Sequence, residues 1–452
     1  MNTKENKMGV MPVKQLIISM SLPMMLSMLV QALYNVVDSI FVAQIGDGQS
    51  ALAAVTLAFP MQNLMIAVSS GTGVGINALL SRSLGAKDFA KSDSAANNGL
   101  LLTFINYIIF LVIGIFFAGA FINTQTSDPI IRSYGTEYLS IICCFSVALF
   151  FQMTFERLLQ STGKTLFSMI SQGTGAIVNI IFDPLFIFGF GPIPALGVAG
   201  AAYATILGQL IGCSIGIFCN LRFNKEINFS FHKIIAPDSS TIRDIYYVGV
   251  PSILMMSIGS VMTYMMNLIL GTFSSIAISV FGVYFRLQSF FFMPVFGLNN
   301  GLIPVLAYNY GARNKARIKE SLKFALILAV SIMCIGAVCF LSIPEALLHL
   351  FNASDEMISI GVPALRTICL SFPLAGVCIA MGSIFQAFSK SFYSLIVSVG
   401  RQLVVLIPAA WLLSRTGVLA NVWFAFPIAE LASLVLSTFF FTKLYRSTVS
   451  TL

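Results

Sequence analysis

Asp38 is a carboxylate inside a long apolar segment, where an ionised group needs a physical explanation. Gln31, Asn35 and Asp38 are spaced at i, i+4 and i+7, so a helix places all three on one face. A charged side chain in the middle of a membrane helix costs at least about 2.5 kcal/mol and therefore faces protein or water instead of lipid. The spacing predicts a polar helix face directed into the protein.

A second polar stripe lies in the apolar segment at about 164–190. Gln172, Asn179 and Asp183 fall on one face of this predicted helix, and Asn179 and Asp183 are one turn apart. Thr205 lies inside the next apolar segment, where its hydroxyl can reach the same depth. We expect the stripes of the two helices to meet within one bundle.

The depths of the two aspartates support such a meeting. Asp38 and Asp183 each lie about 10 Å below the outer end of their predicted helix, at 1.5 Å per residue. Two carboxylates in a pocket of low dielectric constant must share a proton or bind a cation. We predict a coupling-ion site for H+ or Na+ formed by Asp38, Asp183, Asn179 and Thr205; the alternative is that the carboxylates only link helices through hydrogen bonds.

The composition indicates that these helices lie in a lipid bilayer. Of the 452 residues, 57% are apolar and 9% are charged, against roughly 25% charged in a soluble domain. A water-soluble globule is excluded, and the continuous apolar runs exclude a β-barrel. The net charge of +8 does not indicate a nucleic-acid partner, because the basic residues lie in the gaps between apolar runs.

Twelve membrane helices account for the length of the chain. We predict them at 15–45, 49–82, 94–120, 134–160, 164–190, 195–221, 243–271, 275–310, 319–345, 358–388, 392–415 and 417–443. Nearly all Lys and Arg residues outside these helices lie in the amino tail and in every second loop, whereas the opposite loops hold only Arg132 and Arg415. The positive-inside rule then predicts a multi-pass protein of the cell membrane with both termini in the cytoplasm.

The two halves of the sequence match each other. A shift of 226 residues superposes Gln62 on Gln288, Gly71 on Gly297, Gly85-Ala86-Lys87 on Gly311-Ala312-Arg313, and Gln160 on Gln386. This offset predicts two pseudo-symmetric six-helix bundles, arranged as parallel repeats. We expect an amino lobe at 1–221, a cytoplasmic inter-lobe loop at 222–242 and a carboxy lobe at 243–452.

Two prolines interrupt corresponding helices of the two lobes. Pro23 lies in the first predicted helix and Pro251 in the seventh. Each predicts a kink, which is either a static bend or a hinge for alternating access. The hinge interpretation is of most interest for Pro23, because the same helix carries Asp38.

Adaptable apolar side chains gather in the seventh and eighth predicted helices. The candidates for a substrate cavity are Met255, Met256, Arg286, Phe290 and Phe292. Packing or lipid-facing positions are the alternative for most of them. Glu430 and Arg401 lie within the last two helices, where we expect a structural ion pair, with Arg286 as a rival partner for Glu430.

Chemistry other than transport finds little support. The Thr162-Gly163-Lys164-Thr165 string lacks the first glycine of a phosphate-binding loop, since that position is Leu158. The two histidines provide no buried nucleophile and base pair. We therefore expect no enzyme activity, no cofactor and no metal beyond a coupling Na+, and an ion or substrate gradient as the energy source.

Several strings resemble the MATE (multidrug and toxic compound extrusion) family. They are Asn35-Val-Val-Asp38, Asn179-Ile-Ile-Phe-Asp183-Pro, Gly197-Val-Ala-Gly200-Ala-Ala and the paired Gly-Ala-Lys/Arg loops. The resemblance covers essentially the whole chain. It implies export of bulky, often cationic and amphipathic compounds by antiport with H+ or Na+, through a cavity between two lobes.

The resemblance also implies roles for single residues. Asp38, Asn179, Asp183 and Thr205 match the amino-lobe ion site of the prokaryotic branch, and Pro23 matches the proline at which its first helix bends. This sequence departs from another branch of the family, because its seventh and tenth helices lack a carboxylate in mid-membrane. The rival functions are a flippase for a lipid-linked sugar precursor and, more distantly, a receptor or membrane enzyme. A monomer is the expected oligomeric state.

Overall fold

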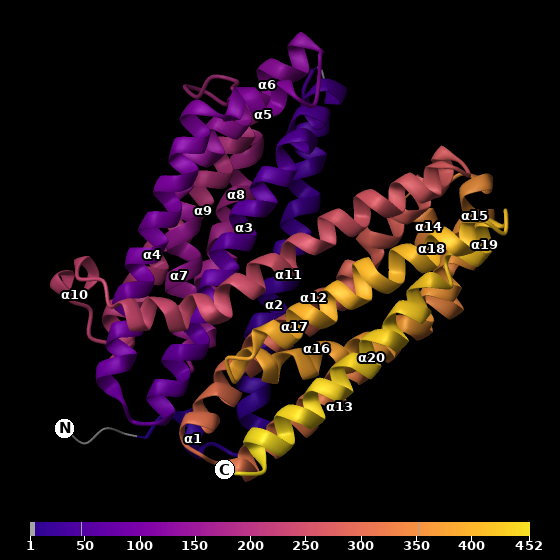
Figure 1. Ribbon diagram of the computed structural model, residues 1–452. Coiled ribbons are helices and arrows are strands. Elements are labelled where there is room, and N and C mark those ends of the chain that lie inside the picture. Colours follow the sequence, from indigo (N-terminus) through magenta and orange to yellow (C-terminus); the bar gives the residue numbers. More distant parts are fainter. Residues whose placement is uncertain (1–4, 47, 352) are drawn as a thin grey trace. The chain divides into compact units, whose positions relative to one another are not determined.

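The computed structural model describes residues 5–46, 48–351 and 353–452, and in this part of the chain the regular elements are helices (Figure 1). An isolated antiparallel bridge joins Phe190 and Ile193. Within these described residues, eleven helices are long and apolar enough to cross a membrane, or twelve if a bent pair of helices is counted as one span. The predicted all-α membrane fold is confirmed.

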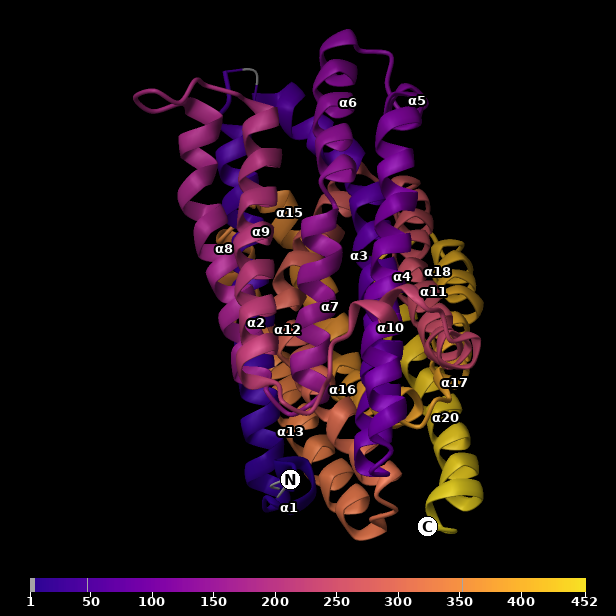
Figure 2. The ribbon, with the colours of Figure 1, turned by 90° about the vertical axis from the view of Figure 1, so that its left-hand side faces the viewer.

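The first half of the chain contains the following helices: α1 (Lys7–Val10), α2 (Val13–Ala43), α3 (Gly48–Gly85), α4 (Phe89–Phe116), α5 (Ala118–Asn123), α6 (Pro129–Cys144), α7 (Val147–Ser161), α8 (Thr165–Phe188), α9 (Val198–Phe223) and α10 (Phe231–Ile235). Helices α8 and α9 run side by side in both views (Figures 1 and 2).

The second half contains α11 (Ser239–Gly271), α12 (Ser275–Gly311), α13 (Lys315–Ser342), α14 (Pro344–His349), α15 (Asp355–Ile368), η1 (Cys369–Ser371), α16 (Phe372–Ala387), α17 (Ser391–Val399), η2 (Gly400–Leu406), α18 (Ile407–Ser414), α19 (Leu419–Val422), α20 (Ala425–Leu444) and η3 (Tyr445–Val449). The segments η2 and η3 are π-helical, and each continues from an α-helix within one membrane span.

The fourth predicted span, 134–160, is not one continuous helix. It consists of α6 and α7, which meet at an angle of 45°. The Ser146 hydroxyl donates to the carbonyl of Cys143 at 2.7 Å at this break. Such a side-chain bond to the backbone competes with continuation of the helix, and hydropathy alone does not reveal it.

The sequence repeat reappears as a repeat of local structure. Lys87 and Arg313, which the shift superposes, both adopt a left-handed backbone with φ of 59° and 56°. The residues that follow them, Asp88 and Asn314, each cap the next helix by accepting a backbone N–H three residues on. A chance match of small residues does not produce the same turn and the same cap, so the internal duplication is confirmed.

A second pair of turns obeys the same offset. Gly163 and Ser389 both have positive φ, at 87° and 59°. Just after them, the Lys164 N–H donates to Leu159 O at 2.7 Å and the Lys390 N–H donates to Phe385 O at 2.6 Å. Ser389 keeps the left-handed conformation although a glycine occupies the matching position in the first half.

The chain divides into two compact units whose boundaries lie inside helices. The amino unit is Leu26–Ile253, and the carboxy unit is Met1–Met25 together with Leu254–Leu452. Helices α2 and α11 each begin in one unit and end in the other. This division follows packing, whereas the predicted lobes at 1–221 and 243–452 follow the repeat, and those lobe boundaries stay a prediction.

Glycines at matched positions of the repeat contact the first parts of α2 and α11, which we call the exchanged helix segments because each helix ends in the other unit. In the amino unit, a Cβ on Gly75 of α3 would run into the carbonyl oxygen of Ile245 of α11. In the carboxy unit, a Cβ on Gly301 of α12 would lie 2.7 Å from Ser21 Cα of α2. Gly75 and Gly301 are matched positions, so each copy of the repeat provides the same close helix contact to the first part of an exchanged helix.

Candidate functional site

Asp38 of α2 and Asp183 of α8 approach each other inside the amino unit. Their carboxyl groups lie within hydrogen-bonding reach of each other. Asp183 is completely buried, with 0% of its surface exposed, and Asp38 is half-buried. Two carboxylates can hydrogen-bond each other only when one of them holds a proton, so this contact is sensitive to the protonation of the pair.

Each carboxylate of the pair also has an oxygen without a donor. The Oδ1 atoms of Asp38 and Asp183 are buried, and neither has a hydrogen-bond partner among the described residues. A buried charged oxygen without a partner costs free energy. A proton or a small cation between the two carboxylates removes that cost, because it supplies the positive charge that the surrounding side chains do not.

Asn179 and Thr205 complete the polar group around Asp183. With its amide oxygen directed at the Thr205 backbone N–H (3.0 Å), Asn179 donates its amide N–H to Asp183 Oδ2 at 3.0 Å. The Thr205 hydroxyl lies 3.2 Å from the same amide and donates to the carbonyl of Ala201 at 3.0 Å. The four residues chosen from the sequence thus belong to one cluster, formed by α2, α8 and α9.

Two tyrosines and a glutamine extend this cluster and were not predicted. Tyr34 of α2 hydrogen-bonds with the side chain of Thr205 and lies near both aspartates. Tyr138 of α6 lies near the same aspartates and hydrogen-bonds with the side chain of Gln62 of α3. Tyr34 lies one turn before Asp38, and this spacing was a signal that the sequence offered. Tyr138 carries no such signal, because packing of a distant helix brings it to the site.

The predicted polar face next to the site forms a separate contact. Gln172 of α8 donates its side-chain N–H to Gln31 of α2 at 3.1 Å. This bond joins the two helices that carry the aspartates, at a level nearer the start of each helix. Asn35 lies between Gln31 and Asp38 on α2 and is exposed at the surface of the described chain.

The walls around the aspartates are apolar and well packed. One cluster of buried side chains in the amino unit comprises, among others, Val42, Tyr138, Ile187, Val198 and Ile206 from α2, α6, α8 and α9. The described residues contain no group of three or more His, Cys, Asp or Glu side chains that could hold a metal ion. Two carboxylates with amide and hydroxyl oxygens suit H+ or a hard monovalent cation better than a transition metal.

A second buried polar network lies on α7. Glu156 accepts a hydrogen bond from Gln152 at 3.0 Å, while Arg157 donates to Gln160 at 3.0 Å and to Ser70 of α3 at 3.1 Å. Both charged residues are buried, with 7% and 6% of their surfaces exposed. Polar neighbours hold these charges inside the protein, and the network links α7 to α3.

The carboxy unit contains the expected pair between Arg401 and Glu430. Arg401 Nη1 lies 3.3 Å from Glu430 Oε2. The Arg401 side chain is 32% exposed and that of Glu430 is 7% exposed. Arg401 belongs to the π-helix η2, and a π-helical turn shifts side-chain directions along a helix. The predicted ion pair is confirmed, and Arg286 has no ion pair with Glu430.

The predicted substrate-cavity residues lie in several environments. Met256 and Phe290 are exposed at 38% and 46%, Arg286 is also exposed, and Met255 is partly buried. Phe292 packs edge to face on Phe372, with ring centroids 5.3 Å apart. None of the five lines the 370 Å³ cavity that the carboxy unit contains. Their role in substrate binding stays a prediction.

Both predicted kink prolines lie close to a boundary between the compact units. Pro23 precedes the last residue of α2 that belongs to the carboxy unit, Met25, by two positions. Pro251 precedes the last residue of α11 that belongs to the amino unit, Ile253, by two positions as well. A proline in the helix interior removes a backbone hydrogen bond, so each helix lacks one bond close to the position where it changes unit.

Known proteins resemble this chain over its whole length. The MatE family model matches residues 23–185 and 251–412, once in each half. The multidrug export protein MepA of Staphylococcus haemolyticus (strain JCSC1435) is 29% identical over 424 residues, which cover 93% of this chain and 91% of that protein.

Solved structures share the fold. A multidrug resistance MATE family transporter of the MOP superfamily, in an outward-facing conformation, superposes with a TM-score of 0.93 at 24% identity and covers 100% of both chains. A MOP superfamily transporter from Pyrococcus furiosus Vc1 (DSM3638) superposes with a TM-score of 0.91 at 25% identity over 100% of this chain and 99% of that one. The latter is described as having a binding pocket of reverse polarity that suggests a different function.

Proposed function

The chain belongs to the MatE family, and from this premise we propose that it exports bulky, often cationic and amphipathic compounds by antiport with H+ or Na+. Full-length similarity to a multidrug export protein supports the substrate class. The observation that carries the coupling mechanism is the contact between Asp38 and Asp183, which leaves one oxygen of each carboxylate buried without a donor.

Electrostatics connects ion loading to the conformation of α2. Without a cation, Asp38 and Asp183 repel each other across a pocket of low dielectric constant. A proton or Na+ removes this repulsion and draws the outer part of α2 toward α8. Release of the cation reverses the change, so the position of α2 depends on the occupancy of the pair.

Either cation fits the side chains around the pair. For H+, one carboxyl group donates to the other, and Asn179 stabilises Asp183 through its 3.0 Å hydrogen bond. For Na+, the carboxylates can be joined by the oxygens of Asn179 and Thr205, which are the hard ligands that such an ion prefers. Both versions use the same four residues, and they differ only in the ion gradient that drives export.

The hinge at Pro23 gives this local change a larger effect. Pro23 and Asp38 lie on one helix, about 22 Å apart at 1.5 Å per residue. The helix belongs to the carboxy unit before Leu26 and to the amino unit from Leu26 onward. A bend at Pro23 that follows the occupancy of Asp38 can therefore be transmitted to both units, which is what alternating access requires.

The proposal includes a topology and an oligomeric state. Clustering of Lys and Arg in the amino tail and alternate loops supports cytoplasmic termini in the cell membrane. Each copy of the repeat contributes helices to a single chain, so a monomer is sufficient for transport. A flippase for a lipid-linked sugar precursor would need free basic groups for a pyrophosphate. Its candidates are Arg286, Arg366 and Arg401, and the last of these is engaged by Glu430.

Dye efflux from proteoliposomes tests the proposal. An inward H+ gradient and an inward Na+ gradient are imposed separately, and export of a cationic dye is followed by fluorescence. We expect one of the two gradients to drive efflux in the wild type and Asp38→Asn to abolish the response. Glu137→Gln, which removes an exposed carboxylate of the amino unit, is the matched control. Efflux by Asp38→Asn at the wild-type rate under the same gradient would refute coupling through this pair.

Expression in a drug-sensitive bacterial host provides the cellular version of this test. Wild-type protein and Glu137→Gln should raise resistance to cationic compounds, whereas Asp38→Asn should not, at equal amounts of membrane-inserted protein. Transfer of a lipid-linked sugar across the bilayer without dye efflux would favour the flippase instead.

A further inference from the structure

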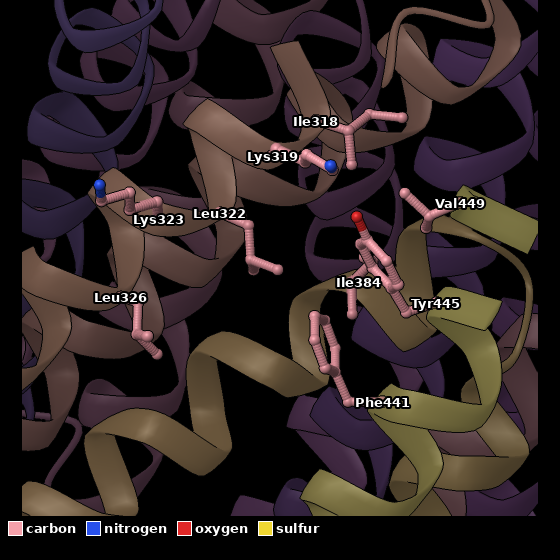
Figure 3. Close-up of a pocket in the computed structure, with 9 residues that line it drawn as sticks. All are labelled: Ile318, Lys319, Leu322, Lys323, Leu326, Ile384, Phe441, Tyr445 and Val449. Atoms are coloured by element: carbon pink, nitrogen blue, oxygen red, sulfur yellow. The ribbon is translucent and has the colours of Figure 1, made fainter. Parts of the chain in front are cut away.

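A cavity of about 370 Å³ opens in the carboxy unit, at the end of the helices where both α13 begins and the chain ends (Figure 3). Helix α13 provides one wall, and α20 with the π-helix η3 provides the opposite wall. The volume falls within the range of roughly 300–1,000 Å³ typical of small-molecule sites. None of the residues assigned to ion coupling lines it.

Two lysines form the polar rim of this cavity. Lys319 and Lys323 lie one turn apart on α13, so they project from one face of the helix. Both are exposed, and neither forms an ion pair within the described residues. In Figure 3 the Lys319 amine points toward the hydroxyl end of Tyr445, while the Lys323 amine lies at the opposite side. Like charges at this spacing repel each other, so a negative charge at this rim of the cavity is favoured.

The neighbouring basic residues of α13 have other partners. Lys315 donates to the carbonyl of Ser450 at 2.8 Å, and Arg317 donates to the carbonyls of Met8 and Met11 at 3.0 and 2.7 Å. Lys315 thus links the last residues to the start of α13, and Arg317 links residues near the amino end to it. Within the described part of the chain, Lys319 makes only a cation–π contact, with its amine 5.5 Å from the centre of the Tyr445 ring.

The floor of the cavity is apolar. Leu322 and Leu326 line it from α13, Ile384 from α16 and Phe441 from α20. A free phosphate would gain nothing from this floor. A ligand that uses both parts of the cavity has an anionic head and a hydrocarbon chain.

We propose that this cavity binds an anionic phospholipid of the membrane, with its phosphate at the rim that carries Lys319 and Lys323 and part of an acyl chain on the floor. Charge complementarity selects the head group, and the apolar floor selects a lipid over a soluble anion. Lys319 and Lys323 belong to the cation-rich side of the predicted topology, which faces the negatively charged cytoplasmic leaflet. The lipid fills the gap between α13 and α20 and stabilises their packing.

Photo-crosslinking in nanodiscs tests the proposal at the level of the site. The protein is reconstituted in phosphatidylcholine with a small fraction of phosphatidylglycerol that carries a diazirine near the end of one acyl chain. We expect crosslinks to peptides of α13 and α20, and competition by unlabelled phosphatidylglycerol but not by added phosphatidylcholine. The diazirine reacts at the floor, so loss of a lysine does not remove the reacting group.

Two variants probe the two parts of the cavity. Lys319→Gln with Lys323→Gln should weaken phosphatidylglycerol binding by about 25-fold, since each basic residue near an anionic lipid contributes roughly fivefold. Leu322→Trp keeps both charges, fills the floor and should also reduce crosslinking. Arg313→Gln with Lys443→Gln is the control, because it removes the same charge at the same end of the unit and neither residue lines the cavity.

Three outcomes would overturn the proposal. The first is equal crosslinking in the wild type and the double lysine variant. The second is an equal loss in the control, which would indicate a general effect of surface charge. The third is full competition by inorganic phosphate at the lysines without any effect of Leu322→Trp, which would assign the site to a soluble anion.

Discussion

Replacement of Asp183 by Asn is the sharpest test of the carboxylate pair. Asn has nearly the same shape, and its side-chain oxygen can still accept the hydrogen bond that Asn179 gives to Asp183 at 3.0 Å. The variant therefore keeps the packing and removes one negative charge from a position with 0% exposure. Any effect on coupling then reports the charge.

The size of the effect follows from Coulomb's law. A carboxylate about 4 Å from a bound cation contributes about 4 kcal/mol at an effective dielectric constant of about 20. Repulsion between the two carboxylates exists with and without the cation, so to first order it does not alter this difference. Loss of about 4 kcal/mol corresponds to about a thousandfold weaker cation binding.

The assay is the dependence of dye efflux on the concentration of the driving cation. Asp183→Asn should raise the half-saturating concentration of H+ or Na+ by about a thousandfold, and Asp38→Asn should do the same. The double variant should lose more than either single variant, since each single variant keeps one carboxylate that still attracts the cation. Glu137→Gln should behave as the wild type.

A specific result would refute this reasoning. If Asp183→Asn kept a half-saturating concentration within about threefold of the wild type, the charge of Asp183 would not contribute to cation binding. Thermal unfolding in detergent provides the control for folding, because the wild type and Asp183→Asn should unfold at similar temperatures.

Three further predictions concern other parts of the chain. Gly301→Ala should destabilise the packing of α2 on α12 by about 1–3 kcal/mol, measured by thermal unfolding in detergent, and a wild-type unfolding temperature would contradict the close contact. Arg401→Met should lower the free energy of unfolding by roughly 2–3 kcal/mol more than Glu430→Gln does. Glu430 is the more buried partner, so loss of Arg401 leaves a buried carboxylate without its ion pair. An equal loss in the two variants would contradict this order. The hydrogen bond from Thr241 lowers the pKa of Asp238 below its usual value. The contribution of the Asp238 carboxylate to stability is therefore present above that usual value and is lost as the pH falls. Asp238→Asn should remove this acid dependence from hydrogen exchange at 236–241, and an unchanged pH profile in the variant would contradict the role of Asp238.

The helices and the repeat were predictable because they depend on local patterns. Hydropathy places a span at 15–45 where the helix is Val13–Ala43, and one at 275–310 where the helix is Ser275–Gly311. The offset of 226 residues correctly matches Lys87 with Arg313, since both positions need the same left-handed turn. Such features require no knowledge of how distant helices pack.

The features of the fold and of the site that the sequence did not predict depend on tertiary contacts. The spacing of polar residues indicated the polar faces of α2 and α8, but the position of Tyr138 beside them results from the packing of α6. The break between α6 and α7 contains no proline or glycine, and a hydroxyl bond of Ser146 to the backbone lies at it. The cavity on α13 needs Ile384 and Phe441 from two other helices, and no motif in the sequence connects them.

The exchange of helix segments between the two units has a consequence for biosynthesis. The amino unit includes 239–253, which the ribosome makes after the loop that separates the two copies of the repeat. The carboxy unit, in turn, includes Val13–Met25, which the ribosome makes before any of the other membrane helices of that unit. Multidomain chains commonly complete one domain before the next emerges. Here the amino unit, Leu26–Ile253, is continuous and can be completed in that manner, whereas the carboxy unit cannot form until 254–452 have joined the segment that precedes Leu26.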